Sequence, residues 1–282
     1  MTFVSGISYN TIEIIDCLVL GRDYQTGRKL YEHLQSLTLT GTPRVRRHCI
    51  ASEAEFWACL RELEAQCQIG WKPLIHFEAH AGKAGLEVPD SANPKGVTLP
   101  WPVLVDPLRR INIASGFNLG VFVAACEGIE AIRPMTIKKP APYMFLIGPS
   151  TEIPAEDVEL ASKCFYDAIM TGMDLTKATR QLPKTFITFL AERFFTSTYA
   201  RVLRAQNIGR NRLERVDTLV NMVLPIDSAP PEQLKVVRDA AKVYSRPDRE
   251  RFEAALAAYL PGGVSYDFDE LIEFARAGGK TK

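Results

Sequence analysis

Short apolar runs alternate with segments of helical spacing through the first half of the chain. Several of these runs are β-branched or continuously apolar and are bounded by turn residues, which is typical of strands. The expected strands cover residues 11–20, 44–51, 73–79, 118–126 and 143–147. The expected helices between them cover residues 25–37, 52–68 and 102–115. Strands that alternate with helices in this way predict a mostly parallel sheet flanked by helices.

Capping and turn residues mark the ends of these segments. Ser52 precedes the second helical segment and Glu55 follows three residues later, which is the pattern of a capping box. The stretch 83–98 is rich in turn residues and holds two short strand-like pieces, so we expect a hairpin inserted after the third strand. Pro107 lies inside the third helical segment and is expected to kink or split that helix.

The pattern changes after Pro149. Helical spacing of apolar residues dominates from there on, without a strand pattern or an internal repeat. The expected helices cover residues 155–170, 175–181, 185–206, 210–222, 231–243, 247–259 and 267–277. We therefore expect an α/β domain over residues 1–182, followed by a helical C-terminal extension over residues 183–282.

Composition narrows the class of protein. The 282 residues are 46% hydrophobic and 24% charged, which is the balance of a globular domain. The net charge of +1 supplies no overall field, so we expect no direct nucleic-acid binding and no attraction to an anionic membrane. No apolar run approaches the roughly 18 residues of a membrane span, and the first residues lack the pattern of a signal peptide.

The six cysteines form no C-x-x-C pair, so neither a zinc ribbon nor a redox dithiol is indicated. Together with the missing signal pattern, this favours reduced thiols in a cytoplasmic protein. Five of the cysteines lie within apolar patterns and are expected in the core: Cys17, Cys49, Cys59, Cys67 and Cys164.

Candidate chemistry lies at two strand ends. The third strand ends at His80 and the fourth at Cys126. Ligands of open α/β sheets bind beyond the carboxyl ends of the strands, so neighbouring parallel strands would bring these side chains together. An imidazole stabilises the reactive thiolate and can then protonate a leaving amine. The backbone N–H groups of Ala81, Gly82 and Cys126 are candidates to hold the oxyanion of acyl transfer.

Neighbouring polar residues have competing interpretations. Glu78 alternates onto the same face as His80 and either orients it or has a structural role. His76 lies about 13 Å upstream along the strand and is expected to be packed in the interior. The HFEAH segment is not H-E-x-x-H and lies on a strand, so no metal site is expected.

The strings PLIHFEAH, over residues 73–80, and GVFVAACEG, over residues 120–128, carry a family resemblance. The sequence resembles caspase-like cysteine peptidases, and within them the CHAT branch found largely in bacteria. Residues 99–108 resemble the family's tryptophan-containing helix, and residues 142–178 its next strand, loop and helix. The resemblance spans roughly residues 10–182. It implies a caspase-like fold, a Cys126–His80 dyad and a regulated effector of bacterial defence or cell death.

The sequence also departs from the family. Ala81 stands between His80 and the usual glycine, and Ala124 and Glu127 replace the glutamine and arginine of caspases proper. These replacements remove groups suited to an acidic substrate residue, so aspartate specificity is not expected. A basic or small apolar residue before the scissile bond fits better. Its candidate acidic contacts are Glu127, Glu152 and Asp157, and Asp106 is a further candidate for a substrate contact.

Three functions compete on the sequence. The leading hypothesis is a cysteine endopeptidase that acts on a protein substrate, needs no cofactor or metal, and responds to a separate protein activator. Its C-terminal helices would be a docking surface. The alternative is a catalytically inactive caspase-fold interaction module. A nucleotide-binding α/β domain is disfavoured because no G-x-G-x-x-G or G-x-x-x-x-G-K-[ST] loop follows the first strand.

Overall fold

The computed structural model describes residues 8–38, 43–90, 92–224 and 229–278. The chain divides into two compact units, the first ending at Ala191 and the second beginning at Glu192. Each unit is described by itself.

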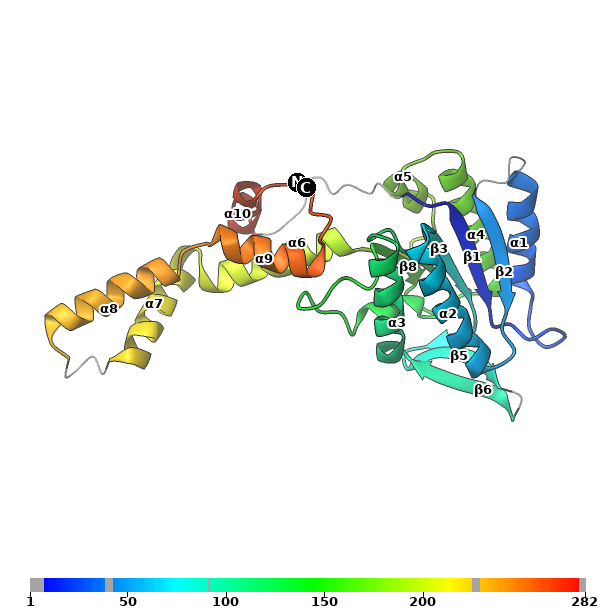
Figure 1. The fold of residues 1–282 in the computed structure, drawn as a ribbon, viewed down its shortest axis with the longest axis horizontal. Helices are drawn as coiled ribbons and strands as arrows, with labels where there is room; N and C mark the ends of the chain where they lie inside the picture. Colours follow the sequence, from blue (N-terminus) through cyan, green and yellow to red (C-terminus); the bar gives the residue numbers. More distant parts are fainter. Residues whose placement is uncertain (1–7, 39–42, 91, 225–228, 279–282) are drawn as a thin grey trace. The chain divides into compact units, whose positions relative to one another are not determined.

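The first unit is built on a six-stranded sheet (Figure 1). Its strands lie in the order β2 (Arg44–Cys49), β1 (Thr11–Asp16), β3 (Pro73–Glu78), β7 (Gly120–Ala124), β8 (Phe145–Pro149) and β9 (Phe186–Leu190). The first five pair in parallel, and β9 adds antiparallel to β8 at one edge. The expected mostly parallel sheet is confirmed.

Helices cover both faces of this sheet, and residues alternate between them. On one face α1 (Thr26–Leu37) and α4 (Ala155–Met170) pack against a core that includes Ile12, Ile14 and Phe122. On the other face lie α2 (Glu53–Gln68) and α3 (Trp101–Ala114), which contact each other. The short helix α5 (Leu175–Arg180) packs on α4. Burial on both faces explains the nearly continuous apolar runs of the central strands.

The hairpin expected after the third strand is present. Strands β4 (Ala81–Gly82), β5 (Gly85–Asp90) and β6 (Asn93–Pro100) form a small antiparallel sheet that leads directly into α3. Helix α3 runs through Pro107 as one element, so of the two expected effects of this proline, a kink or a split, the split does not occur. Ser52 caps α2, as expected, by accepting the Glu55 N–H at 3.2 Å.

Strand β9 is the main departure from expectation in this unit. Residues 185–206 were expected to be helical, but 186–190 pair with β8 and the helix α6 begins only at Ala191. Phe186 and Phe189 are buried while Ile187 is exposed, so the apolar residues also suit a strand that is partly covered. Pairing with the open edge of β8 outweighs the local helical spacing, and the first unit therefore extends beyond residue 182.

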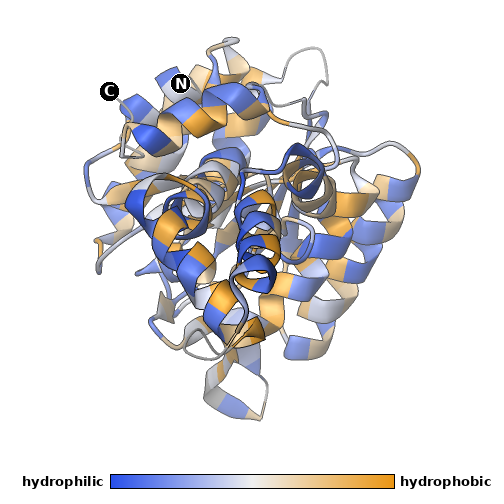
Figure 2. Ribbon diagram, turned by 90° about the vertical axis from the view of Figure 1, so that its left-hand side faces the viewer, coloured by the Kyte–Doolittle hydropathy of each residue, from blue (hydrophilic) through white to orange (hydrophobic). Residues whose placement is uncertain are grey.

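The second unit is helical, as the spacing of its apolar residues predicts. It contains α6 (Ala191–Gln206), α7 (Gly209–Val223), α8 (Pro231–Tyr244), α9 (Arg249–Tyr259) and α10 (Phe268–Arg276). Aromatic rings in mutual contact, among them Phe195, Phe252 and Tyr259, form its core. Apolar and polar residues alternate around the helices in Figure 2, as amphipathic helices require. Among the helices of the described residues, none has the length and apolar character to cross a membrane.

Candidate active site

The carboxyl ends of β1, β3 and β7 meet at one edge of the sheet, because these strands are parallel neighbours. The segment after β1 supplies Asp23, the segment after β3 supplies His80, and the segment after β7 supplies Cys126. All three side chains line one cavity of about 310 Å³. The thiol and the imidazole, which 46 positions separate in the sequence, therefore share a single cleft.

A tight turn presents Cys126 after β7. The Gly128 N–H donates to the Ala125 carbonyl at 3.1 Å, and Glu127 adopts a left-handed conformation with φ 54°. A side chain on Gly128 would meet Val123 Cγ1 at 2.7 Å, so glycine allows the following 3-10 helix η1 (Gly128–Ile132) to fold back closely. A non-glycine residue in this conformation stores about 1 kcal/mol or more, a feature that clusters at functional sites.

The Cys126 thiol is partly accessible, and its Sγ lies 3.9 Å from the Ile153 carbonyl oxygen. Burial raises the pKa of the Cys59 and Cys67 thiols to about 12, so these two stay protonated and unreactive at neutral pH. Cys17 is also buried, so the expected core position is confirmed for Cys17, Cys59 and Cys67. The expectation of a core position is wrong for Cys49, which is exposed, and Cys164 is only partly buried. Cys49 lies on β2, which is the outermost strand of the sheet among the described residues, and edge strands are less covered than central ones.

Asp23 holds the imidazole of His80. Asp23 Oδ1 lies 3.2 Å from His80 Nε2, and the aspartate side chain is 7% exposed against 55% for the histidine. Because Nε2 faces the carboxylate, Nδ1 is the nitrogen available to Cys126. A carboxylate in this position fixes the orientation of the ring.

The loop that carries Asp23 also keeps its carboxylate ionised. Burial by itself raises the pKa of Asp23, but hydrogen bonds from the Arg22 guanidinium, the Val19 N–H and His80 outweigh it and lower the pKa to about 2. The Val19 N–H donates to Oδ2 at 2.8 Å, and Arg22 Nε donates to Oδ1 at 3.0 Å. The sequence did not identify Asp23, since the loop after β1 has no periodicity and matches no motif.

A second cavity of about 430 Å³ adjoins Cys126 on its other side. The lining includes Ala81 and Gly82, whose backbone was proposed for the oxyanion, and the candidate substrate residues Glu127 and Glu152. Lys83 Nζ lies 3.6 Å from Glu127. Trp101 Nε1 donates to the Gly82 carbonyl at 3.0 Å, which fixes this backbone against α3. The four residues proposed around the nucleophile, Ala81, Gly82, Glu127 and Glu152, thus line one cavity with Cys126.

The structure decides the roles of the two other polar residues on β3. Glu78 is 1% exposed and accepts hydrogen bonds from His76 Nε2 at 2.8 Å and from Thr26 Oγ1 at 2.5 Å. It therefore does not orient His80, and its role is structural. His76 is fully buried and stacks on Phe122 at 5.0 Å between ring centroids, which confirms the packed position expected for it.

Two further candidate substrate residues lie outside both cavities beside Cys126. Asp106 is exposed and forms an ion pair with Arg109 on α3. Asp157 is exposed near the start of α4. In the described part of the chain, no group of three or more His, Cys, Asp or Glu side chains is arranged to hold a metal ion.

No protein-family model matches the chain, and no curated protein matches its sequence. One similar solved structure is a secreted C11 cysteine protease from Bacteroides thetaiotaomicron in complex with an irreversible peptide inhibitor. It is 8% identical, with a TM-score of 0.39, and the match covers 92% of this chain and 84% of that chain. A likeness of this size does not decide chemistry.

Proposed function

We propose that this protein is a cysteine endopeptidase in which Cys126 is the nucleophile, His80 the acid and base, and Asp23 the residue that positions His80. One observation carries the proposal: a thiol, an imidazole and an ionised carboxylate line one cleft at the carboxyl ends of three neighbouring parallel strands. The combination of a nucleophile, a base and a group that orients the base is the general arrangement for covalent catalysis by a side chain.

The reaction follows from the roles of these groups. The Cys126 thiolate attacks the peptide carbonyl carbon, and the His80 imidazolium gives its proton to the departing amine. The acyl group remains as a thioester on Sγ. Water then adds to the thioester while His80 accepts a proton from it, and the C–S bond breaks to release the acid and regenerate the thiolate.

Backbone groups beside Cys126 would stabilise the negative oxygen of the tetrahedral intermediates. The His80 carbonyl accepts the Glu87 N–H at 2.8 Å, and Ala81 is the next residue, opposite Leu86. Hydrogen-bonded and non-hydrogen-bonded pairs alternate in an antiparallel ladder, so the Ala81 N–H is directed away from β5. Ala81 is therefore a stronger candidate donor than Gly82, and together with the Cys126 N–H it would supply about 3–4 kcal/mol per donor.

The acidic cavity beside Cys126 supports selection of a basic residue in the substrate. Glu127 and Glu152 line it, and Lys83 partly neutralises Glu127. Ala124, which lines the catalytic cavity, offers no polar group to a substrate carboxylate. The two glutamates would therefore contact a basic side chain next to the scissile bond.

A role as a regulated effector in bacterial defence or cell death is supported by the family resemblance alone. In that role the enzyme would act in the cytoplasm on a protein substrate, under control of a separate protein activator. The helices of the second unit are the part of the chain that the peptidase chemistry leaves unused, which suits them to contact such an activator.

The proposal is tested by labelling with a fluorescent acyloxymethyl ketone, which alkylates an activated thiolate. The wild-type chain should be labelled rapidly at Cys126. Cys126→Ala should lose this labelling, and His80→Ala should be labelled much more slowly. Cys49→Ala is the matched control, because Cys49 is exposed but lies outside the catalytic cavity. Labelling that survives Cys126→Ala, or that is indifferent to His80→Ala, would leave only an inactive assembly module.

A further inference from the structure

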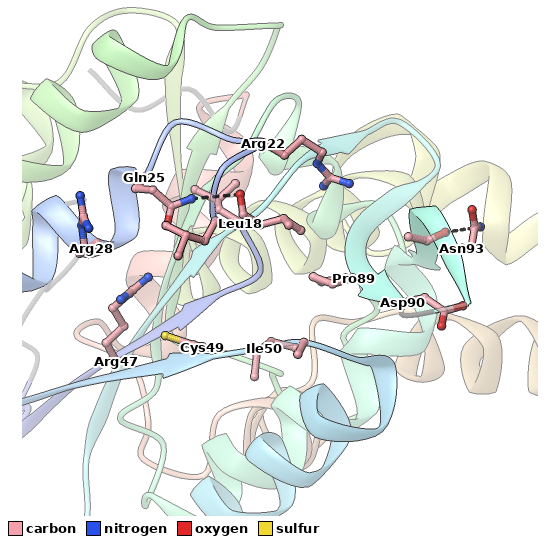
Figure 3. A pocket seen from close by; sticks show the side chains of 14 residues that line it. Leu18, Arg22, Gln25, Arg28, Arg47, Cys49, Ile50, Pro89, Asp90 and Asn93 are labelled. Carbon is pink, nitrogen blue, oxygen red and sulfur yellow. Dashed lines mark hydrogen bonds between the residues drawn. The ribbon is translucent and has the colours of Figure 1, made fainter.

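A third and larger cavity, of about 520 Å³, opens beside the catalytic one (Figure 3). It lies at the carboxyl ends of β1 and β2 and is closed on the far side by the β5–β6 hairpin. Leu18, Cys49 and Ile50 give it an apolar floor. Figure 3 shows Arg28 and Arg47 on one side of the cavity and the hairpin residues on the other.

Three guanidinium groups line this cavity. Arg22, Arg28 and Arg47 all line it, against one carboxylate, that of Asp90. Arg47 is bound to the buried Asp16 at 2.7 Å, and Arg22 is bound to Asp23. The ion pair of Arg28 is weaker than these two. Arg28 lies 3.7 Å from Glu32, and the two side chains are 51% and 65% exposed. Arg28 can therefore turn to an incoming anion at little cost.

The arginine cavity and the catalytic cavity adjoin, because Leu18 and Arg22 line both. Their order follows the order of the strands. The cavity with Glu127 and Glu152 borders the ends of β7 and β8, the catalytic cavity borders β1, β3 and β7, and the arginine cavity borders β2 and β1. A peptide laid across the strand ends would meet carboxylates on one side of Cys126 and guanidinium groups on the other.

We propose that the arginine-lined cavity binds an acidic side chain of the substrate, on the opposite side of the scissile bond from the residue that meets Glu127 and Glu152. This inference rests on the proposed peptidase function. Guanidinium groups bind carboxylates with two parallel hydrogen bonds, and an apolar floor strengthens such a contact by excluding water. Because the cavity shares Leu18 and Arg22 with the catalytic cleft, part of the substrate is favoured as the occupant over a free anion.

The test is a randomised decapeptide library, digested by the wild-type chain and sequenced by mass spectrometry. Aspartate and glutamate should be enriched over asparagine and glutamine at positions on one side of the cleavage site, by about five-fold for a partly exposed ion pair. Arg28→Gln should remove most of that enrichment. Arg110→Gln is the matched control, because Arg110 is also 51% exposed and paired with a glutamate but lines none of these cavities.

A second measurement does not need turnover. Fluorescein-labelled decapeptide pools with one fixed aspartate or one fixed asparagine are bound to Cys126→Ala and followed by anisotropy. The aspartate pools should bind more tightly, and the difference should shrink in the Arg28→Gln background and with added salt.

The outcomes separate the two proposals. Cysteine-dependent cleavage without acidic enrichment, or with enrichment that survives Arg28→Gln, overturns the acidic subsite and leaves the peptidase intact. Free glutarate is added as a competitor. If it abolishes the anisotropy difference at the same concentration as the aspartate peptides, the cavity would be assigned to a small organic anion instead. Absence of any Cys126-dependent labelling or cleavage overturns the peptidase, and the substrate subsite with it.

Discussion

Replacing Asp23 with asparagine tests whether this carboxylate holds the catalytic loop. The pKa of Asp23 lies at about 2 instead of 3.8, which corresponds to roughly 2 kcal/mol of preference for the charged form. Asparagine keeps the shape and one hydrogen-bond acceptor but removes the charge. The free energy of unfolding should therefore fall by about 1–2 kcal/mol at pH 7, because Arg22 and the Val19 N–H lose a charged acceptor.

The pH dependence has a definite sign. A carboxyl group with a lowered folded-state pKa contributes stability above its unfolded pKa of 3.8 and loses that stability as the pH falls toward 2. Urea unfolding should show a constant difference between the two proteins from pH 7 to pH 5, and a smaller difference below pH 4. A difference that is absent at pH 7, or that grows on acidification, would refute the reasoning.

The same variant has a catalytic consequence that stability alone does not produce. Without the charged acceptor, His80 is less firmly oriented, so labelling of Cys126 should slow by about tenfold, or 1.4 kcal/mol in the barrier. Arg22→Gln is the control. It weakens the loop by removing the other strong partner of Asp23, but it leaves the contact between Asp23 and His80 in place. Equal slowing in both variants would show that loop stability, and not orientation of the imidazole, is responsible.

Three further substitutions probe the surroundings of the site. Glu78→Gln should lower the free energy of unfolding by about 1–3 kcal/mol, measured by urea unfolding, because it disturbs the buried hydrogen bonds from His76 and Thr26. Trp101→Phe should lower the free energy of unfolding by about 1 kcal/mol and slow the labelling of Cys126, since the Gly82 carbonyl loses its hydrogen-bond donor. Unfolding and labelling are measured on one sample. Glu127→Gly should not destabilise the chain, because the left-handed conformation at this residue suits glycine, and a lower unfolding midpoint in urea would contradict that strain argument.

The fold could be predicted from sequence wherever local pattern and tertiary environment agree. Central strands such as β7 are buried on both faces, so their apolar runs have no competing interpretation. The helices of the second unit are amphipathic, and their spacing locates them within a few residues. Strand β9 could not be predicted, because its pairing depends on the open edge of β8 rather than on its own pattern.

The candidate site divides in the same way. His80 and Cys126 stand at the ends of predicted strands, so the rule for parallel sheets was sufficient to bring them to one edge. Alternation left two roles open for Glu78, because it gives the face of a side chain but not its partners; those partners are His76 on the same strand and Thr26 on α1. Asp23 lies in an irregular loop, and its position depends on hydrogen bonds that no local pattern specifies.

Three carboxylates near the ends of β1 and β3 explain how the loop after β1, which carries Asp23, can position His80. Asp16 accepts from Arg47 and the Leu18 N–H, and Glu78 accepts from Thr26 at the first turn of α1. Gly27 lets the start of α1 lie against both, since a Cβ there would collide with the Asp16 carboxylate. The partial positive charge of a helix N-terminus favours this placement. The loop is thus anchored by an ion pair to Asp16 at one end and by a hydrogen bond to the buried Glu78 at the other, and the third carboxylate, Asp23, lies within reach of His80.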